Sequence, residues 1–148
     1  MKKNYIWIVA AVAAVGYFVY RKMNFAKNLL FRLSDVKPDG SLTNPKVIIS
    51  VSVNNPSNQK ATINAVSGTL YLDQREISVV NTTNTQIIAP RTESIIRIVA
   101  KPSLVGIFKL LRDVFSKEKR EGLEYTFKFI GNINVDGVLL PINEEYKL

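Results

Sequence analysis

The most regular pattern in the chain is an alternation of apolar and polar positions that begins near residue 47. Val47, Ile49, Val51 and Val53 fall on one face of residues 47–54. A two-residue period of this kind is typical of a strand with one face on a core. The pattern stops at residues 55–58, Asn-Pro-Ser-Asn, where proline and short polar side chains favour a tight turn.

The same alternation recurs in several short segments, at residues 61–72, 77–80, 86–88, 94–100 and 123–146. Residues 94–100 are largely apolar on both sides, which predicts a strand in the interior of a sheet. Asp136-Gly137 is a two-residue hairpin signal within the last segment. Upstream, we expect residues 25–33 to form a connector or first strand that ends in a turn-rich stretch at 35–41. These features predict a mainly β protein, an antiparallel immunoglobulin-like β-sandwich.

One amphipathic helix interrupts the predicted strands. Between residues 104 and 115 the apolar side chains recur every three or four positions, after a start signal at Pro102 and Ser103. The helix is expected to end in the charged run at 117–120, which we interpret as a solvated end that complements the helix dipole.

A second kind of pattern lies at the N-terminus, where residues 5–20 carry no charge and are mostly apolar. A helix over this run would be about 24 Å long, somewhat shorter than a hydrocarbon core of about 30 Å. Aromatic and basic flanking residues can close the difference by lying at headgroup level. The run therefore predicts an N-terminal transmembrane helix, and its expected membrane-anchor residues are Tyr5, Trp7, Tyr17, Tyr20, Arg21 and Lys22.

Two other interpretations of this run are weaker. Residues 11–13, Ala-Val-Ala, fit a signal cleavage site, but cleavage there would leave an apolar region of only six residues before the site. A helix buried on one side of a core should show a polar face, and this run has none. The charges on the two flanks leave the orientation in the membrane open.

Together these patterns divide the chain into an anchor with basic flanks (1–23), a connector and first strand (24–46) and a β-sandwich (47–148). The net charge of +8 includes four basic residues that flank the apolar run, and the other 16 basic residues are interleaved with 12 acidic ones. This mixture is typical of a solvated surface, so nucleic acid is not an expected partner. The expected partner is a lipid bilayer, and the expected location is a membrane crossed once, on a side left open.

The residue inventory removes most catalytic chemistry. The chain has no histidine and no cysteine, which excludes histidine-assisted nucleophiles and the usual zinc sites. Glu144 and Glu145 are adjacent and would point to opposite faces of a strand, while Asp35 and Asp39 lack the spacing of a calcium loop. We therefore expect no enzyme activity, no catalytic or metal-binding residues, no cofactor and no small-molecule substrate.

The order of segments 51–57, 66–72, 88–93, the helix after Ser103 and 125–140 resembles the late-embryogenesis-abundant proteins of the water-stress and hypersensitive-response type. The chain departs from that family in having no histidine and in having its only tryptophan, Trp7, in the apolar run. The resemblance implies an immunoglobulin-like sandwich without catalysis, associated with stress protection or with binding.

The expected function is a structural, scaffolding or binding role at a membrane surface, with protein partners or self-association. Two alternatives are a minor structural protein of a membrane-containing virus or phage particle and a stress-protection or lipid-binding domain.

Overall fold

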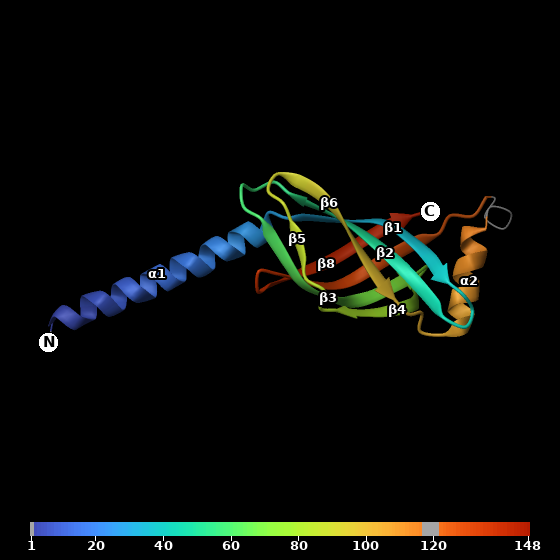
Figure 1. Cartoon of the computed structure of the whole chain (residues 1–148), viewed down its shortest axis with the longest axis horizontal. Coiled ribbons are helices and arrows are strands. Elements are labelled where there is room, and N and C mark those ends of the chain that lie inside the picture. The colour runs from blue at the N-terminus through green and yellow to red at the C-terminus, as the bar shows by residue number, and fades with distance from the viewer. Residues whose placement is uncertain (1, 117–121) are drawn as a thin grey trace.

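The computed structural model describes residues 2–116 and 122–148 (Figure 1). It contains α1 (Lys2–Lys27), β1 (Leu30–Gly40), β2 (Pro45–Asn55), β3 (Ala61–Leu72), β4 (Arg75–Thr82), β5 (Gln86–Ile88), β6 (Thr92–Ala100), α2 (Val105–Phe115), β7 (Thr126–Val135) and β8 (Val138–Lys147). The charged run predicted to end the internal helix, 117–120, lies outside the described residues.

The strands form two antiparallel sheets. One has the order β1-β2-β6, and the other has the order β4-β3-β7-β8 with β5 paired to β3. The two sheets pack as a sandwich, and α2 lies at the end opposite α1 (Figure 1). The predicted antiparallel β-sandwich with one inserted helix is therefore confirmed.

The core between the sheets follows the predicted alternation. Val47, Ile49, Val51 and Val53 of β2 are all buried and face the other sheet. From that sheet come fully buried residues such as Leu70, Phe127, Phe129 and Ile133. Burial of aliphatic and aromatic side chains is the main favourable contribution to such a fold.

On the core face of β3 and β7, two glycines lie directly opposite each other. Gly68 is the register partner of Gly131. The ring of the buried Phe129 occupies the space next to Gly68 on this face. The two backbones are so close that no side chain fits between them at this point.

The hairpin between β7 and β8 is built as predicted. Asp136 and Gly137 have positive φ values of 50° and 85°, the backbone geometry that a two-residue type I′ turn needs. Glycine adopts this region freely, and aspartate tolerates it better than most residues.

The prediction for residues 94–100 was wrong in one respect. Among the described strands, β6 is hydrogen-bonded only to β2, and it forms an edge of the three-stranded sheet. Its inward residues are buried, but Ile95 and Val99 are 61% and 60% exposed. Apolar side chains on both faces of a strand therefore did not indicate a strand with neighbours on both sides.

The predicted turn at 35–41 also differs from the structure. β1 continues to Gly40 and pairs with β2 as far as Pro45, so the turn lies at residues 41–44. Pro38 is tolerated because β1 is an edge strand, where a residue without an N–H can face away from the ladder. A bulge between Leu33 and Asp35 further bends this strand.

Helix α2 begins near the predicted position, but its cap differs from the prediction. Leu104 is the N-cap residue and has no side-chain capping bond. The hydroxyl of Ser103 is instead 3.3 Å from Glu76 Oε1. The apolar face of α2 packs on the sandwich, with the Phe115 and Phe127 rings stacked at a centroid distance of 5.9 Å.

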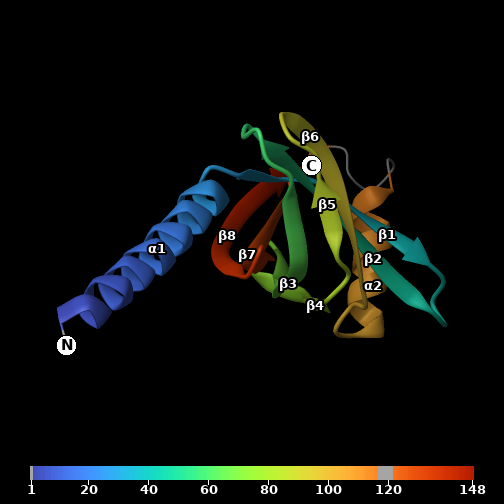
Figure 2. The same ribbon diagram turned by 60° about the vertical axis from the view of Figure 1, so that its left-hand side comes forward.

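Helix α1 projects away from one end of the sandwich in both ribbon views (Figure 1, Figure 2). It continues past the expected boundary at residue 23 to Lys27, and Ala26 and Leu29 are buried in the core cluster. In the part of the chain that the structure describes, no helix is apolar over enough of its length to cross a membrane. The predicted transmembrane helix is therefore not supported.

Candidate functional site

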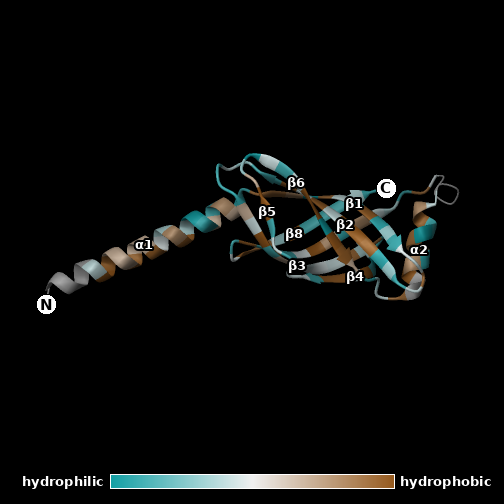
Figure 3. Cartoon of the chain, viewed as in Figure 1, coloured by the Kyte–Doolittle hydropathy of each residue, from teal (hydrophilic) through white to brown (hydrophobic). Residues whose placement is uncertain are grey.

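Most of α1 has no protein neighbour in the structure. Its surface is predominantly apolar along the middle of the helix, with a hydrophilic band close to the sandwich (Figure 3). The exposed large apolar residues are Trp7, Ile8, Val9, Val12, Val15, Tyr17, Phe18, Val19, Tyr20 and Met23. A contiguous apolar surface of this kind marks a site of interaction with a membrane or another protein.

The expected anchor residues are all on α1. Trp7, Tyr17 and Tyr20 are between 61% and 77% exposed, and the side chain of Tyr5 lies outside the described ones. Arg21 and Lys22 follow directly after the apolar stretch and are exposed. The Arg21 guanidinium carbon lies 6.0 Å from the centroid of the Tyr17 ring, within the range of a cation–π contact.

A groove lies where α1 meets the sandwich. We call it the basal groove; its lining residues are Phe18, Arg21, Lys22, Phe25, Ser57, Asn58, Gln59, Lys60 and Asp136, around a volume of about 600 Å³. They come from α1, from the β2–β3 turn and from the β7–β8 hairpin. Both of these connections lie at the end of the sandwich from which α1 projects (Figure 1).

The β2–β3 turn is held in shape by one buried side chain. Asn55 is fully buried, and its amide nitrogen donates to the carbonyl oxygens of Gln59 at 2.7 Å, Ala89 at 3.2 Å and Ile88 at 3.4 Å. Its amide oxygen accepts from the backbone N–H and the hydroxyl of Ser57, at 3.1 and 2.8 Å. One amide group thus fixes both sides of the turn that carries Asn58, Gln59 and Lys60.

Neighbouring loops hold the groove from two further sides. The backbone N–H of Arg91 donates to Ser57 O at 3.0 Å, and its Nε donates to Asn58 Oδ1 at 2.5 Å. On the hairpin, Asp136 Oδ2 accepts from the backbone N–H of Thr62 at 3.3 Å, and the Asp136 N–H donates to Thr62 O at 2.8 Å. The walls of the groove are therefore tied to strands and not carried by a free loop.

The charges in the groove are unbalanced. Arg21, Lys22 and Lys60 contribute three positive charges, and Asp136 contributes one negative charge. Arg21, Lys22 and Lys60 are exposed, so their charged groups can reach a ligand in the groove. The arrangement favours an anion, and the adjacent Phe18 and Phe25 rings offer apolar contact.

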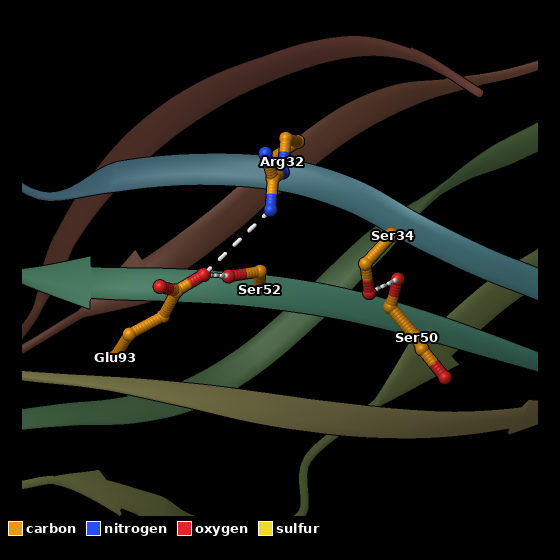
Figure 4. A network of polar contacts seen from close by, with 5 residues as sticks. All are labelled: Arg32, Ser34, Ser50, Ser52 and Glu93. Carbon is orange, nitrogen blue, oxygen red and sulfur yellow. Dashed lines mark hydrogen bonds and ion pairs between the residues drawn. The ribbon is translucent and has the colours of Figure 1, made fainter.

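A polar network on the outer face of the three-stranded sheet joins β1, β2 and the start of β6 (Figure 4). Ser52 Oγ donates to Glu93 Oε1, and Arg32 Nη2 lies 3.8 Å from the same oxygen. Beside it, Ser34 Oγ donates to Ser50 O at 3.0 Å, next to the bulge in β1.

Serine and glutamate in contact could suggest a nucleophile and a base. A carboxylate is a weak base for a hydroxyl. The Arg32 and Glu93 side chains are 72% and 58% exposed, so the ion pair itself adds little stability. We interpret the network as a tie between neighbouring strands.

Sequence reasoning identified Arg21 and Lys22 but not the other walls of the groove. The missed residues, Lys60 and Asp136 among them, lie in two turns that were each predicted correctly as turns. A usable signal was the order of the strands. Because β1 runs away from α1 and β2 returns, the β2–β3 turn must lie beside α1 in an antiparallel sandwich.

Within the described residues, no group of three acidic side chains is placed to hold a metal ion. No family model matches the chain, and no curated protein matches it in sequence.

Similar folds occur among solved structures. A protein from Arabidopsis thaliana has a TM-score of 0.57 and 20% identity, with 80% of this chain and 79% of that chain covered. A protein described as late embryogenesis abundant has a TM-score of 0.52 and 15% identity, covering 99% of this chain and 85% of that one. A protein from Archaeoglobus fulgidus has a TM-score of 0.51 and 7% identity, covering 78% and 94%. The sandwich therefore has the late-embryogenesis-abundant type of fold, as the sequence resemblance implied.

Proposed function

We propose that the protein is a non-enzymatic β-sandwich attached to a lipid bilayer by insertion of α1, with a structural or binding role at the membrane surface. The observation that carries this proposal is the apolar, exposed surface of α1, which has no partner within the sandwich. An interfacial helix would have a polar face along its length. The stretch from Trp7 to Tyr20 carries no charge on any side, which favours immersion in lipid.

The energetic argument supports the same conclusion. Full burial of a large apolar side chain contributes roughly 1.5–3 kcal/mol. Side chains such as Ile8, Val12, Val15 and Phe18 are between 59% and 67% exposed, so most of this energy is available to an apolar environment. Summed over the ten exposed large apolar residues of α1, insertion would contribute on the order of 10 kcal/mol. Arg21 and Lys22 would then lie at headgroup level, where Lys and Arg side chains are favoured.

Replacement of Val15 by aspartate tests the role of α1. An aspartate in the middle of an inserted helix costs about 2.5–3.5 kcal/mol, so we expect the partition of Val15→Asp into neutral phosphatidylcholine vesicles to fall at least tenfold. Flotation of the full-length protein with vesicles measures this partition directly.

The matched control is Val79→Asp on β4. Val79 is 61% exposed and Val15 is 64% exposed, so the two substitutions change equally accessible valines on different elements. We expect Val79→Asp to float with vesicles like the unmodified protein. Equal losses for the two variants, or no flotation of the unmodified protein, would contradict attachment through α1.

The structural likeness to a late-embryogenesis-abundant protein supports a second candidate function, stress protection. In that case the chain should reduce the heat-induced aggregation of a sensitive enzyme, measured by light scattering, and Val15→Asp should retain this effect. The alternatives of a virus-particle component and a lipid-binding domain stay predictions.

A further inference from the structure

The basal groove combines two chemistries in one concavity. Three cationic side chains line it together with two aromatic rings, around a volume of about 600 Å³. Arg21 and Lys22 are on α1, whereas Lys60 comes from the β2–β3 turn, so the cations reach the groove from two different elements. Cations from separate elements can surround an anion, which a row of lysines on one helix face cannot do.

The groove also has a defined position along α1. It begins where the apolar stretch ends, because Phe18, Arg21 and Lys22 belong both to the end of that stretch and to the lining of the groove. If α1 is inserted in a bilayer, the groove lies at the level of the lipid phosphates. The inference that follows thus rests on the proposed function.

We propose that the basal groove binds the phosphate of an anionic phospholipid headgroup. Arg21, Lys22 and Lys60 contact the phosphate oxygens, and the Phe18 and Phe25 rings contact the glycerol and the first methylenes of the acyl chains. Charge-assisted hydrogen bonds from Arg and Lys to phosphate are among the stronger polar contacts in proteins.

The groove is organised before any ligand arrives. Asn55 holds the turn that carries Lys60, and the Arg91 side chain holds Asn58 at the rim. The one acidic residue, Asp136, already accepts a hydrogen bond from the Thr62 N–H. Three positive charges and the one negative charge of Asp136 give the groove a net charge of +2, which is complementary to the negative charge of a phosphate group.

A soluble phosphate compound shares this headgroup chemistry, but the aromatic walls favour the lipid. Free phosphate has no apolar part to contact Phe18, which is 66% exposed, or the partly buried Phe25. In a phospholipid the phosphate is followed by apolar acyl chains. In the protein the cationic groove is followed, in the same direction, by the apolar stretch of α1.

The test compares two single variants of the full-length protein that remove the same charge at the same end of the sandwich. Lys60→Gln neutralises the cation that the β2–β3 turn contributes to the groove. Lys27→Gln neutralises an exposed lysine in the last turn of α1, which is not among the lining residues of the groove. Each variant lowers the net charge by one at the end of the sandwich that carries α1, so general attraction to an anionic surface falls by a similar amount.

Binding is measured by flotation with neutral phosphatidylcholine vesicles and with vesicles that also contain phosphatidic acid. We expect phosphatidic acid to strengthen binding of the unmodified protein and of Lys27→Gln. Lys60→Gln should bind the mixed vesicles at least about tenfold more weakly than Lys27→Gln, because it loses a hydrogen bond to a charged phosphate in addition to the general attraction. Equal weakening of both variants would overturn the groove assignment.

The same experiment separates this inference from the proposed function. Binding of all three proteins to neutral vesicles reports insertion of α1, and its absence would contradict the proposed function whatever the groove does. Neutral binding that is retained by all three proteins, without a difference between Lys60→Gln and Lys27→Gln on mixed vesicles, would overturn the groove alone.

A titration followed by NMR in neutral micelles distinguishes the two sources of phosphate. The backbone amide signals of Asn58, Gln59 and Lys60 are followed while short-chain phosphatidic acid or inorganic phosphate is added. We expect the lipid to shift these signals at a lower concentration than inorganic phosphate does. The reverse order would overturn the lipid assignment.

Discussion

Replacing Gly131 with alanine is expected to destabilise the sandwich by about 4 kcal/mol, beyond the usual range for overpacking. A Cβ on Gly131 would lie 2.0 Å from Ser67 O and 2.6 Å from Gly68 Cα, both of which are backbone atoms. Neither can move without separating β3 from β7 in the middle of the five-stranded sheet. For a domain of this size, we expect a fall of about 15 °C in melting temperature, measured by circular dichroism.

The control for this prediction is Gly16→Ala on α1. A Cβ at Gly16 would meet no atom within 4 Å, and alanine is favoured over glycine in a helix. Gly68→Ala should behave like Gly131→Ala, because its Cβ would lie 2.5 Å from Ile130 O. Similar melting temperatures for Gly131→Ala and Gly16→Ala would show that the two strands do not approach each other as closely as described.

The replacement Asn55→Asp is expected to have an effect of similar size, about 4 kcal/mol, because it places an unpaired charge in a buried site. The carboxylate would face the carbonyl oxygens of Gln59, Ile88 and Ala89, which now accept from the Asn55 amide. Urea denaturation at neutral pH gives the change in the free energy of unfolding.

The matched control is Asn54→Asp, one residue earlier on β2. Asn54 is exposed on the other face of the strand and pairs with Glu93 of β6, so we expect a change of at most about 1 kcal/mol, from the repulsion between two carboxylates. Asn55→Ala should fall between the two, since it leaves the carbonyls without a donor but adds no charge. Equal unfolding energies for Asn54→Asp and Asn55→Asp would contradict the role given to Asn55.

The sequence was sufficient to predict those strands in which apolar and polar residues alternate because one face of the strand is buried. β2 alternates cleanly because its inward residues, such as Val47 and Ile49, are buried while its other face is more polar. The β7–β8 hairpin was predictable because Asp136-Gly137 suits a backbone geometry that few residue pairs adopt.

The features that were not predicted depend on neighbours that a local pattern does not report. The apolar residues Ile95 and Val99 made β6 resemble an interior strand. The hydrophobicity of a strand does not indicate whether it has a hydrogen-bonded neighbour on both sides, and β6 has one on one side. Ser103 has the composition of a cap but its hydroxyl contacts Glu76, which is distant in sequence. The basal groove was missed for the same reason, because α1 and two turns meet there only in the folded chain.

The junction between α1 and the sandwich has a mechanical consequence. Ala26 and Leu29 are buried in the core, and the Asn28 and Leu29 N–H groups donate to the carbonyls of Phe25 and Ala26, at 3.2 Å each. Helix α1 is thus rigidly coupled to β1, with no hinge between them. Any tilt or rotation that a bilayer imposes on α1 would therefore also reorient the whole sandwich relative to the membrane.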